Sequence, residues 1–147
     1  MAAAPVEILP HDLAVIEALE TIGCPVGFAE APEGAVEALT TTTGGPDYVV
    51  LYPLPSQRMA SSIDDSVGDV ALVYQTTIVA RLPEGARYLI DKIEAALYTV
   101  AVPNRAVVRI TPDDVGDVRP DNDLQLLNSG GPVFIATPRW RLWTSRA

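Results

Sequence analysis

The chain has 147 residues and a mass of 15.7 kDa, which predicts one domain, large enough to build a hydrophobic core without disulfides or a structural metal. Its net charge of -9 and pI of about 4.4 argue against nucleic-acid binding through a broad basic patch. The single cysteine excludes an internal disulfide, and the single histidine argues against a zinc-type cluster. The sequence also lacks a long apolar run and a signal-peptide pattern, so we expect a cytoplasmic protein without membrane contact.

Residues 1–45 predict one helix and little other regular structure. Residues 1–10 are expected to form a flexible N-terminal arm. Asp12 suits an N-cap and Gly23 a C-terminal stop, and the apolar residues between them recur at helical spacing: Leu13, Val15, Ile16, Leu19 and Ile22. Residues 24–28 are interpreted as a turn, with Cys24 as a small half-buried apolar residue, and residues 33–39 as a weak helical turn.

Two strands and a second helix then form the expected centre of the fold. Residues 46–53 predict a short strand bounded by prolines, and residues 69–81 a longer one with polar residues at alternate places. Pro83 and Glu84 suit a helix N-terminus, and an apolar stripe at helical spacing follows: Leu89, Ile90, Ile93, Ala96, Leu97 and Val100. We expect this helix to pack on the long strand as a two-layer core.

Two strands are predicted after this helix. Residues 105–111 alternate, which places Ala106, Val108 and Ile110 on one side. Residues 133–144 form the last strand, and its two faces differ: Phe134, Ala136, Trp140 and Leu142 on one, Arg139, Arg141 and Trp143 on the other. Because Pro138 has no N–H to donate to a ladder, this strand is expected at a sheet edge or with a bulge.

The elements together predict a single α+β domain in the order α-β-β-α-β-β. About four strands would form a mostly antiparallel or mixed sheet packed with two helices. Two long loops, residues 54–68 and 112–132, interrupt the order, and loops of that length in a small domain usually carry function or become ordered on a partner.

Catalytic, cofactor and metal signatures are weak in this sequence, and we predict none of the three. The strand-to-helix turn at residues 81–85 lacks a phosphate-binding glycine pattern, and His11 has no nucleophile near it in sequence. An acidic cluster in the second loop lacks the spacing of a calcium loop and is interpreted as solvated: Asp113, Asp114, Asp117, Asp121 and Asp123.

Protein binding is the function that the last strand indicates. Arg139, Arg141 and Trp143 alternate with Trp140, and Trp and Arg are enriched at protein interfaces. Trp140 could instead be core, with the arginines keeping an edge soluble. Residues of the two loops complete the candidate interface: Arg58, Met59, Asp113, Asp114, Asp117 and Arg119.

Several phrases, taken in order, resemble the tail terminator proteins of long non-contractile-tailed bacteriophages, especially those that infect actinobacteria. The phrases are Tyr48-Val-Val-Leu-Tyr-Pro, Val73-Tyr-Gln-Thr-Thr-Ile-Val-Ala, the helix of residues 86–97, Val107-Val-Arg-Ile, Val118-Arg-Pro-Asp-Asn-Asp and Val133-Phe-Ile-Ala before Arg139-Trp-Arg-Leu. They span about residues 46–144. The family usually has an arginine followed directly by an aspartate where this chain has Arg119-Pro120-Asp121, so the resemblance does not extend to this pair.

The resemblance implies a structural virion protein and no enzyme. Its subunits would form a hexameric ring on the head-proximal end of the tail tube, stop tube polymerisation and dock the head connector or stopper. Genomic double-stranded DNA would pass through the lumen without specific binding. The protein would reside in the host cytoplasm during assembly and then in the virion tail. Two alternatives are another head-to-tail joining protein, such as a connector adaptor or stopper, and a small dimeric α+β enzyme or ligand-binding module.

Overall fold

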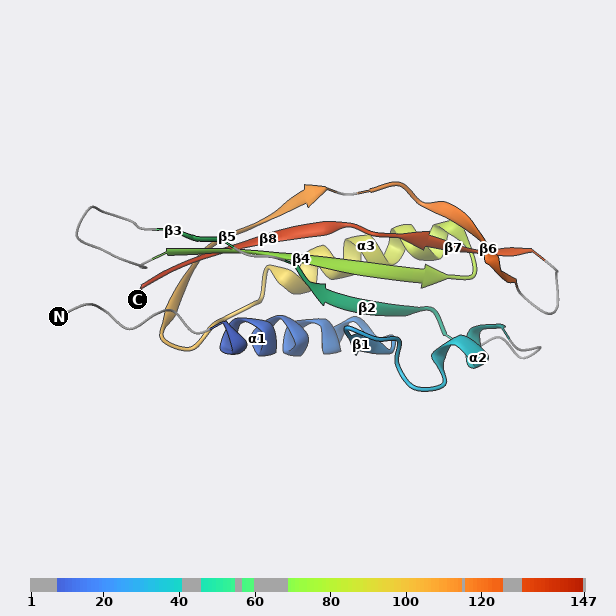
Figure 1. Cartoon of the computed structure of the whole chain (residues 1–147), viewed down its shortest axis with the longest axis horizontal. Helices are drawn as coiled ribbons and strands as arrows, with labels where there is room; N and C mark the ends of the chain where they lie inside the picture. The colour runs from blue at the N-terminus through green and yellow to red at the C-terminus, as the bar shows by residue number, and fades with distance from the viewer. Residues whose placement is uncertain are drawn as a thin grey trace.

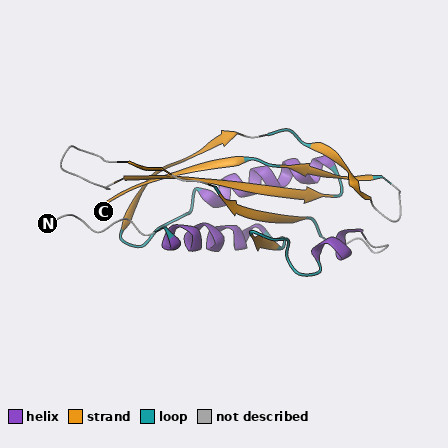
Figure 2. Ribbon diagram, viewed as in Figure 1, coloured by secondary structure: helices purple, strands orange, loops and turns teal. Residues whose placement is uncertain are grey.

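A computed structural model describes residues 8–40, 46–54, 57–59, 69–114, 116–125 and 131–146. It confirms the α+β class, but the expected count of four strands is wrong because eight strands form one sheet (Figures 1 and 2). In chain order the elements are α1 (Leu9–Leu19), the 3-10 helix η1 (Glu20–Ile22), β1 (Val26–Phe28), α2 (Ala35–Thr40), β2 (Tyr48–Pro53), β3 (Gln57–Met59), β4 (Asp69–Ala80), α3 (Pro83–Leu97), β5 (Arg105–Asp114), β6 (Arg119–Gln125), β7 (Pro132–Ala136) and β8 (Arg139–Arg146).

Strand β4 is the centre of the sheet, as its length and composition predicted. It pairs antiparallel with β2 and β3 on one side and with β7 and β8 on the other. Beyond these strands, β1 extends the β2 side in parallel, and β5 and β6 extend the β8 and β7 side antiparallel. The sheet is therefore mixed but mostly antiparallel, with β1 at one edge and β5 and β6 at the opposite edge.

The main core lies between the even-numbered positions of β4 and the helices α1 and α3. Successive strand residues point to opposite faces, so the side chains on one face of β4 all pack into this core. The predicted stripe of the second helix is buried at every position: Leu89, Ile90, Ile93, Ala96, Leu97 and Val100. Trp140, in register with Tyr74, is buried on the same face and is a core residue. On the other face, α2 covers one end of the sheet in a second cluster: Ala35, Leu39, Tyr48, Val50, Val79 and Val133.

Pro138 divides the last predicted strand, and neither half is at an edge. Strand β7 lies between β4 and β6, and β8 lies between β4 and β5, so the expectation of an edge strand is wrong. The break is satisfied locally, because the backbone N–H of Thr76 donates to the Pro138 carbonyl at 3.0 Å. The hydroxyl of Thr76 also accepts the indole N–H of Trp140 at 2.9 Å, which ties the core tryptophan to the break.

Both predicted long loops contain strands. Strand β3 lies within residues 54–68, and the end of β5 together with β6 occupies most of the described part of residues 112–132. These segments are too short or too polar to show alternation, and they are strands because a neighbouring strand accepts and donates their backbone hydrogen bonds. Pro112 and Pro120 fit this placement, since β5 and β6 are at the sheet edge.

The N-terminal third differs most from its prediction. Helix α1 begins at Leu9 with Pro10 in its first turn, so residues 8–10 are not an arm, and residues 1–7 lie outside the described residues. Asp12 is no N-cap; its carboxylate accepts the hydroxyl of Tyr74 at 2.6 Å. Residues 26–28, expected in a turn, form β1. There a Cβ on Gly27 would meet the Glu30 carbonyl oxygen at 2.0 Å, so this close approach requires glycine.

A β-bulge also overturns one predicted face. The pairing of β5 with β8 shifts between Val107 and Arg109. Odd-numbered residues before the bulge and odd-numbered residues after it therefore lie on opposite faces of the sheet. Val107 and Ile110 therefore pack on the core, while Ala106 is exposed. Val108, expected beside them, has a side chain outside the described residues.

Candidate functional site

Three of the predicted interface residues share the open face of the sheet. Arg139, Arg141 and Trp143 are in register with Gln75, Val73 and Ala71 of β4, the odd-numbered positions that point away from α1 and α3. Helix α2 covers only the opposite end of this face. The alternation of the last strand therefore predicted correctly which face these side chains take.

Trp143 lies between two guanidinium groups on this open face. The Cζ atoms of Arg109 and Arg141 are each 5.8 Å from the centroid of its ring, a distance at which a cation interacts with an aromatic quadrupole. Arg141 also forms an ion pair with Asp113 at 3.3 Å, with side chains 33% and 36% exposed. We call Arg109, Arg139, Arg141 and Trp143 the basic face.

Arg109 is the member of the basic face that the sequence did not indicate. In the alternation assumed for residues 105–111 it falls on the same side as Val107, which packs on the core. The bulge between Val107 and Arg109 rotates it onto the open face, opposite Trp143. Only a cross-strand register could have revealed this, because the bulge has no signature in the local sequence.

Two polar atoms of the basic face lack the partners that buried donors usually have. Within the described part of the chain, Nε1 of Trp143 and Nε of Arg141 are buried without a hydrogen-bond partner. Most buried donors in folded proteins are paired, and an unpaired one costs about 1–3 kcal/mol. The hydrogen bonding around Trp143 is thus less complete than that of Trp140, whose indole N–H donates to Thr76.

The other predicted interface residues are not all brought together. Asp113 joins the basic face through Arg141, and Asp114, opposite Arg139, accepts the backbone N–H of Gly116 at 2.9 Å. Asp117 and Arg119 are exposed near the start of β6, where Arg119 is in register with Ile135 of β7. Arg58 and Met59 lie in β3, across β4 from β8, and their side chains are outside the described residues. The predicted interface therefore combined residues of the basic face with residues that lie elsewhere on the molecule.

A second surface, on the opposite edge of the sheet, is acidic. Eight of the 19 acidic residues and none of the 10 Lys and Arg residues lie in residues 1–57. Along β1 and the elements beside it, four glutamates are exposed, together with Phe28, which is 43% exposed. We call this surface the acidic edge: Glu20, Phe28, Glu30, Glu33 and Glu37. In Figure 1, α1, β1 and α2 lie along the lower side of the molecule, and β6 lies at its upper right.

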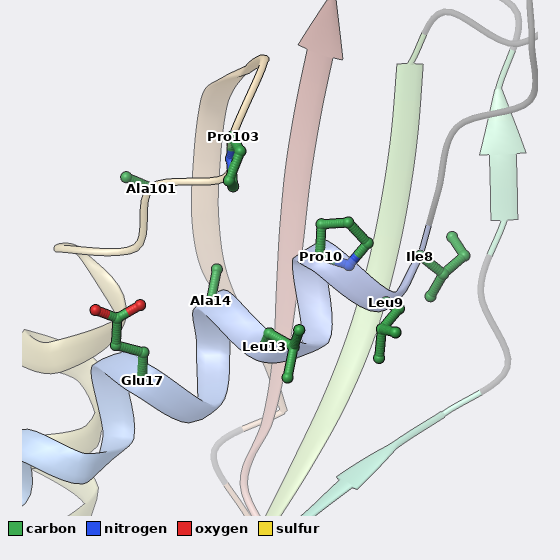
Figure 3. Close-up of a pocket in the computed structure, with 8 residues that line it drawn as sticks. All are labelled: Ile8, Leu9, Pro10, Leu13, Ala14, Glu17, Ala101 and Pro103. Carbon is green, nitrogen blue, oxygen red and sulfur yellow. The ribbon is translucent and has the colours of Figure 1, made fainter.

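An apolar groove opens beside the first turns of α1. Its volume is about 640 Å³, and it lies between α1 and the turn before β5, as Figure 3 shows. Leu9 and Leu13 project at its margin and are 64% and 55% exposed, although Leu13 belongs to the apolar residues that recur at helical spacing. The groove is lined by Ile8, Leu9, Pro10, Leu13, Ala14, Glu17, Ala101 and Pro103. Glu17 is the one ionisable residue in this lining, so the groove suits contact with an apolar surface.

His11, the residue considered for catalysis, and Cys24 are both engaged in the packing of the N-terminal third. Buried His11 lies 2.8 Å from the Thr144 hydroxyl, which also accepts Nε–H of Arg105 at 3.2 Å. Burial, and secondarily the charge of Asp47, raises the pKa of the Cys24 thiol to about 11. A thiol with so high a pKa is a poor source of thiolate at neutral pH.

Neither metal ligation nor a membrane-spanning helix is found where the chain is described. Residues 8–40, 46–54, 57–59, 69–114, 116–125 and 131–146 hold no group of three or more His, Cys, Asp or Glu placed for a metal ion. No helix in these ranges is both long and apolar enough to cross a membrane.

Comparisons with known proteins assign no family to the chain. No protein-family model matches it, and no curated protein matches it. One solved structure, whose name describes no activity, covers 89% of this chain and 85% of its own at 14% identity, with a TM-score of 0.39. A TM-score this low carries no argument about fold or function.

Proposed function

We propose that the protein is a tail terminator subunit of a long non-contractile-tailed bacteriophage, a structural protein without catalytic activity. In this proposal six copies form a ring on the head-proximal end of the tail tube. The ring ends tube polymerisation and presents the surface that docks the head connector. The resemblance over about residues 46–144 is the first support for this function.

The observation that carries the proposal is the presence of two unlike exposed surfaces on one subunit. A closed ring is built from heterologous contacts, in which one surface of a copy meets a different surface of the next. The basic face and the acidic edge lie at opposite sides of the sheet, with β2, β4 and their neighbours between them. A dimeric enzyme would need instead one self-complementary surface and a polar pocket.

The remaining exposed features fit contacts along the tail axis. The apolar groove beside α1, with exposed Leu9 and Leu13, is a candidate seat for the tube protein or the connector. The net charge of -9 suits a lumen through which DNA slides without being held.

The test is negative-stain imaging of the purified protein, with light scattering for mass, alone and mixed with polymerising tail-tube protein of the same phage. We expect six-fold rings, or tubes capped at one end that no longer grow. Rings that bind the purified head connector but leave tube growth unchanged would indicate another joining protein. A stable dimer that neither caps nor shortens tubes would overturn the proposal.

A further inference from the structure

The two charged surfaces differ in sign and in position. The acidic edge has four exposed glutamates, and the segment that supplies them, residues 1–57, contains no Lys or Arg. On the basic face, Arg109 and Arg139 are exposed, Asp113 neutralises Arg141 in part, and Asp114 lies in register with Arg139. Strand β1 is separated from β5 by β2, β4 and β8, so the two surfaces cannot neutralise each other within one molecule.

Each surface also holds one aromatic side chain among its charges. Phe28 is exposed at the end of β1, and the loop that follows folds back so closely on Gly27 that it fixes the position of Glu30. Trp143 lies on the basic face between Arg109 and Arg141. An aromatic residue surrounded by charged groups is the usual composition of an interface centre and its rim.

The signs decide how two copies can meet. A two-fold contact made through either surface alone would place acidic edge against acidic edge, or basic face against basic face, and like charges in contact are costly. A head-to-tail contact instead places the glutamates of one copy against the arginines of the next. Charge complementarity thus selects a second copy of this chain, in a heterologous arrangement, as the occupant of the basic face.

We propose that the acidic edge of one copy binds the basic face of the next, with Phe28 packing beside Trp143. This contact rests on the proposed function, because it is the repeating contact of the terminator ring. It assigns a role to Arg109 that the sequence did not indicate, and it makes ring assembly dependent on salt.

The test uses two charge-reversed forms of the full chain. One form carries Arg109→Glu and Arg139→Glu, and the other carries Glu33→Lys and Glu37→Lys. All four positions are exposed, so both forms should fold. Sedimentation velocity over a range of protein and NaCl concentrations measures association of each form alone, of the wild type and of a one-to-one mixture.

We expect the wild type to associate most strongly at low salt. Each reversed form alone should bind itself at least about tenfold more weakly, because like charges then meet at the contact. The mixture should associate again, since every contact between unlike forms is complementary. Recovery on mixing is the result that a merely misfolded variant cannot give.

Matched reversals on the exposed side of α3 control for net charge. Arg87→Glu with Lys92→Glu lowers the charge as the first form does, and Glu84→Lys with Asp91→Lys raises it as the second does. Both controls should associate as the wild type does. Circular dichroism and thermal unfolding confirm that every form is folded.

Three results would overturn this contact. These are a wild type that stays monomeric at every protein and salt concentration, reversed forms that associate like the wild type, and a mixture that does not recover. The tube-capping assay separates this outcome from failure of the proposed function. If both reversed forms cap tubes normally, the terminator role stands and the contact falls; if the charge-dependent oligomer never caps tubes, the contact stands and the role falls.

Discussion

The two tryptophans of β8 lie three residues apart on opposite faces of the sheet, and their surroundings differ throughout. Trp140 is 2% exposed, and its indole N–H donates to Thr76. Trp143 is only partly buried, its indole N–H has no partner in the described chain, and Arg109 and Arg141 flank its ring. One face of the sheet is buried against the helices, whereas the other carries a partly buried tryptophan among charged side chains, the composition that the proposed contact requires. The first face should therefore govern folding and the second association.

The variant with the largest expected effect is Trp140→Ala, which tests whether the buried face governs folding. Removing a buried tryptophan should lower the free energy of unfolding by about 3–5 kcal/mol, because the lost apolar contacts leave a cavity that the sheet and α3 cannot close. Urea unfolding followed by circular dichroism measures the loss. A loss under about 1 kcal/mol would mean that Trp140 is not part of a packed core.

Thr76→Val tests the polar support beneath Trp140. Valine keeps the shape of threonine but removes the hydroxyl, leaving the indole N–H of Trp140 buried and unpaired. The expected loss in unfolding free energy is about 1–3 kcal/mol. The same substitution at Thr77, whose side chain lies on the other face of β4, is the control and should cost less. Equal losses at the two positions would contradict the role given to Thr76.

Cys24 reports on the helix-covered side, since it packs against the main core. At pH 8 its pKa of about 11, against 9.0 for a free thiol, lowers the thiolate fraction on the order of 100-fold. The greater nucleophilicity of a more basic thiolate offsets part of this, so reaction with an aromatic disulfide reagent should be about tenfold slower than in urea.

The same thiol makes stability depend on pH in a known direction. Because its pKa is raised in the folded state, its contribution to stability is present below about pH 9 and is lost as pH rises through 11. Cys24→Ala should flatten this part of the profile. Native and unfolded chains that react at equal rates would show that the thiol is not shielded.

The smallest expected effect is that of Trp143→Phe. Phenylalanine keeps most of the apolar area and removes an indole N–H that is buried without a partner, so the free energy of unfolding should change by less than about 1 kcal/mol. Trp140→Phe, which leaves the Thr76 hydroxyl without its donor, is the matched comparison and should cost more. If Trp143→Phe is the more destabilising of the two, the open face contributes to folding and the contrast fails.

The sequence alone determined the elements whose signal is local. The alternation of β4, the apolar stripe of α3 and the two faces of β8 follow from periods of two and 3.6 residues. The bounds of β4 were predicted nearly correctly, whereas the last predicted strand is two strands, β7 and β8. Three of the four members of the basic face could be predicted for the same reason. The α+β class followed from the order of these elements.

The tertiary structure decided what depends on a partner distant in the chain. Strands β1, β3 and β6 are too short or too polar to be recognised, and they exist because β2, β4 and β7 pair with their backbones. The bulge that brings Arg109 beside Trp143 is set by cross-strand register. Local periodicity specifies which face a side chain takes, but only long-range hydrogen bonding specifies what lies opposite it.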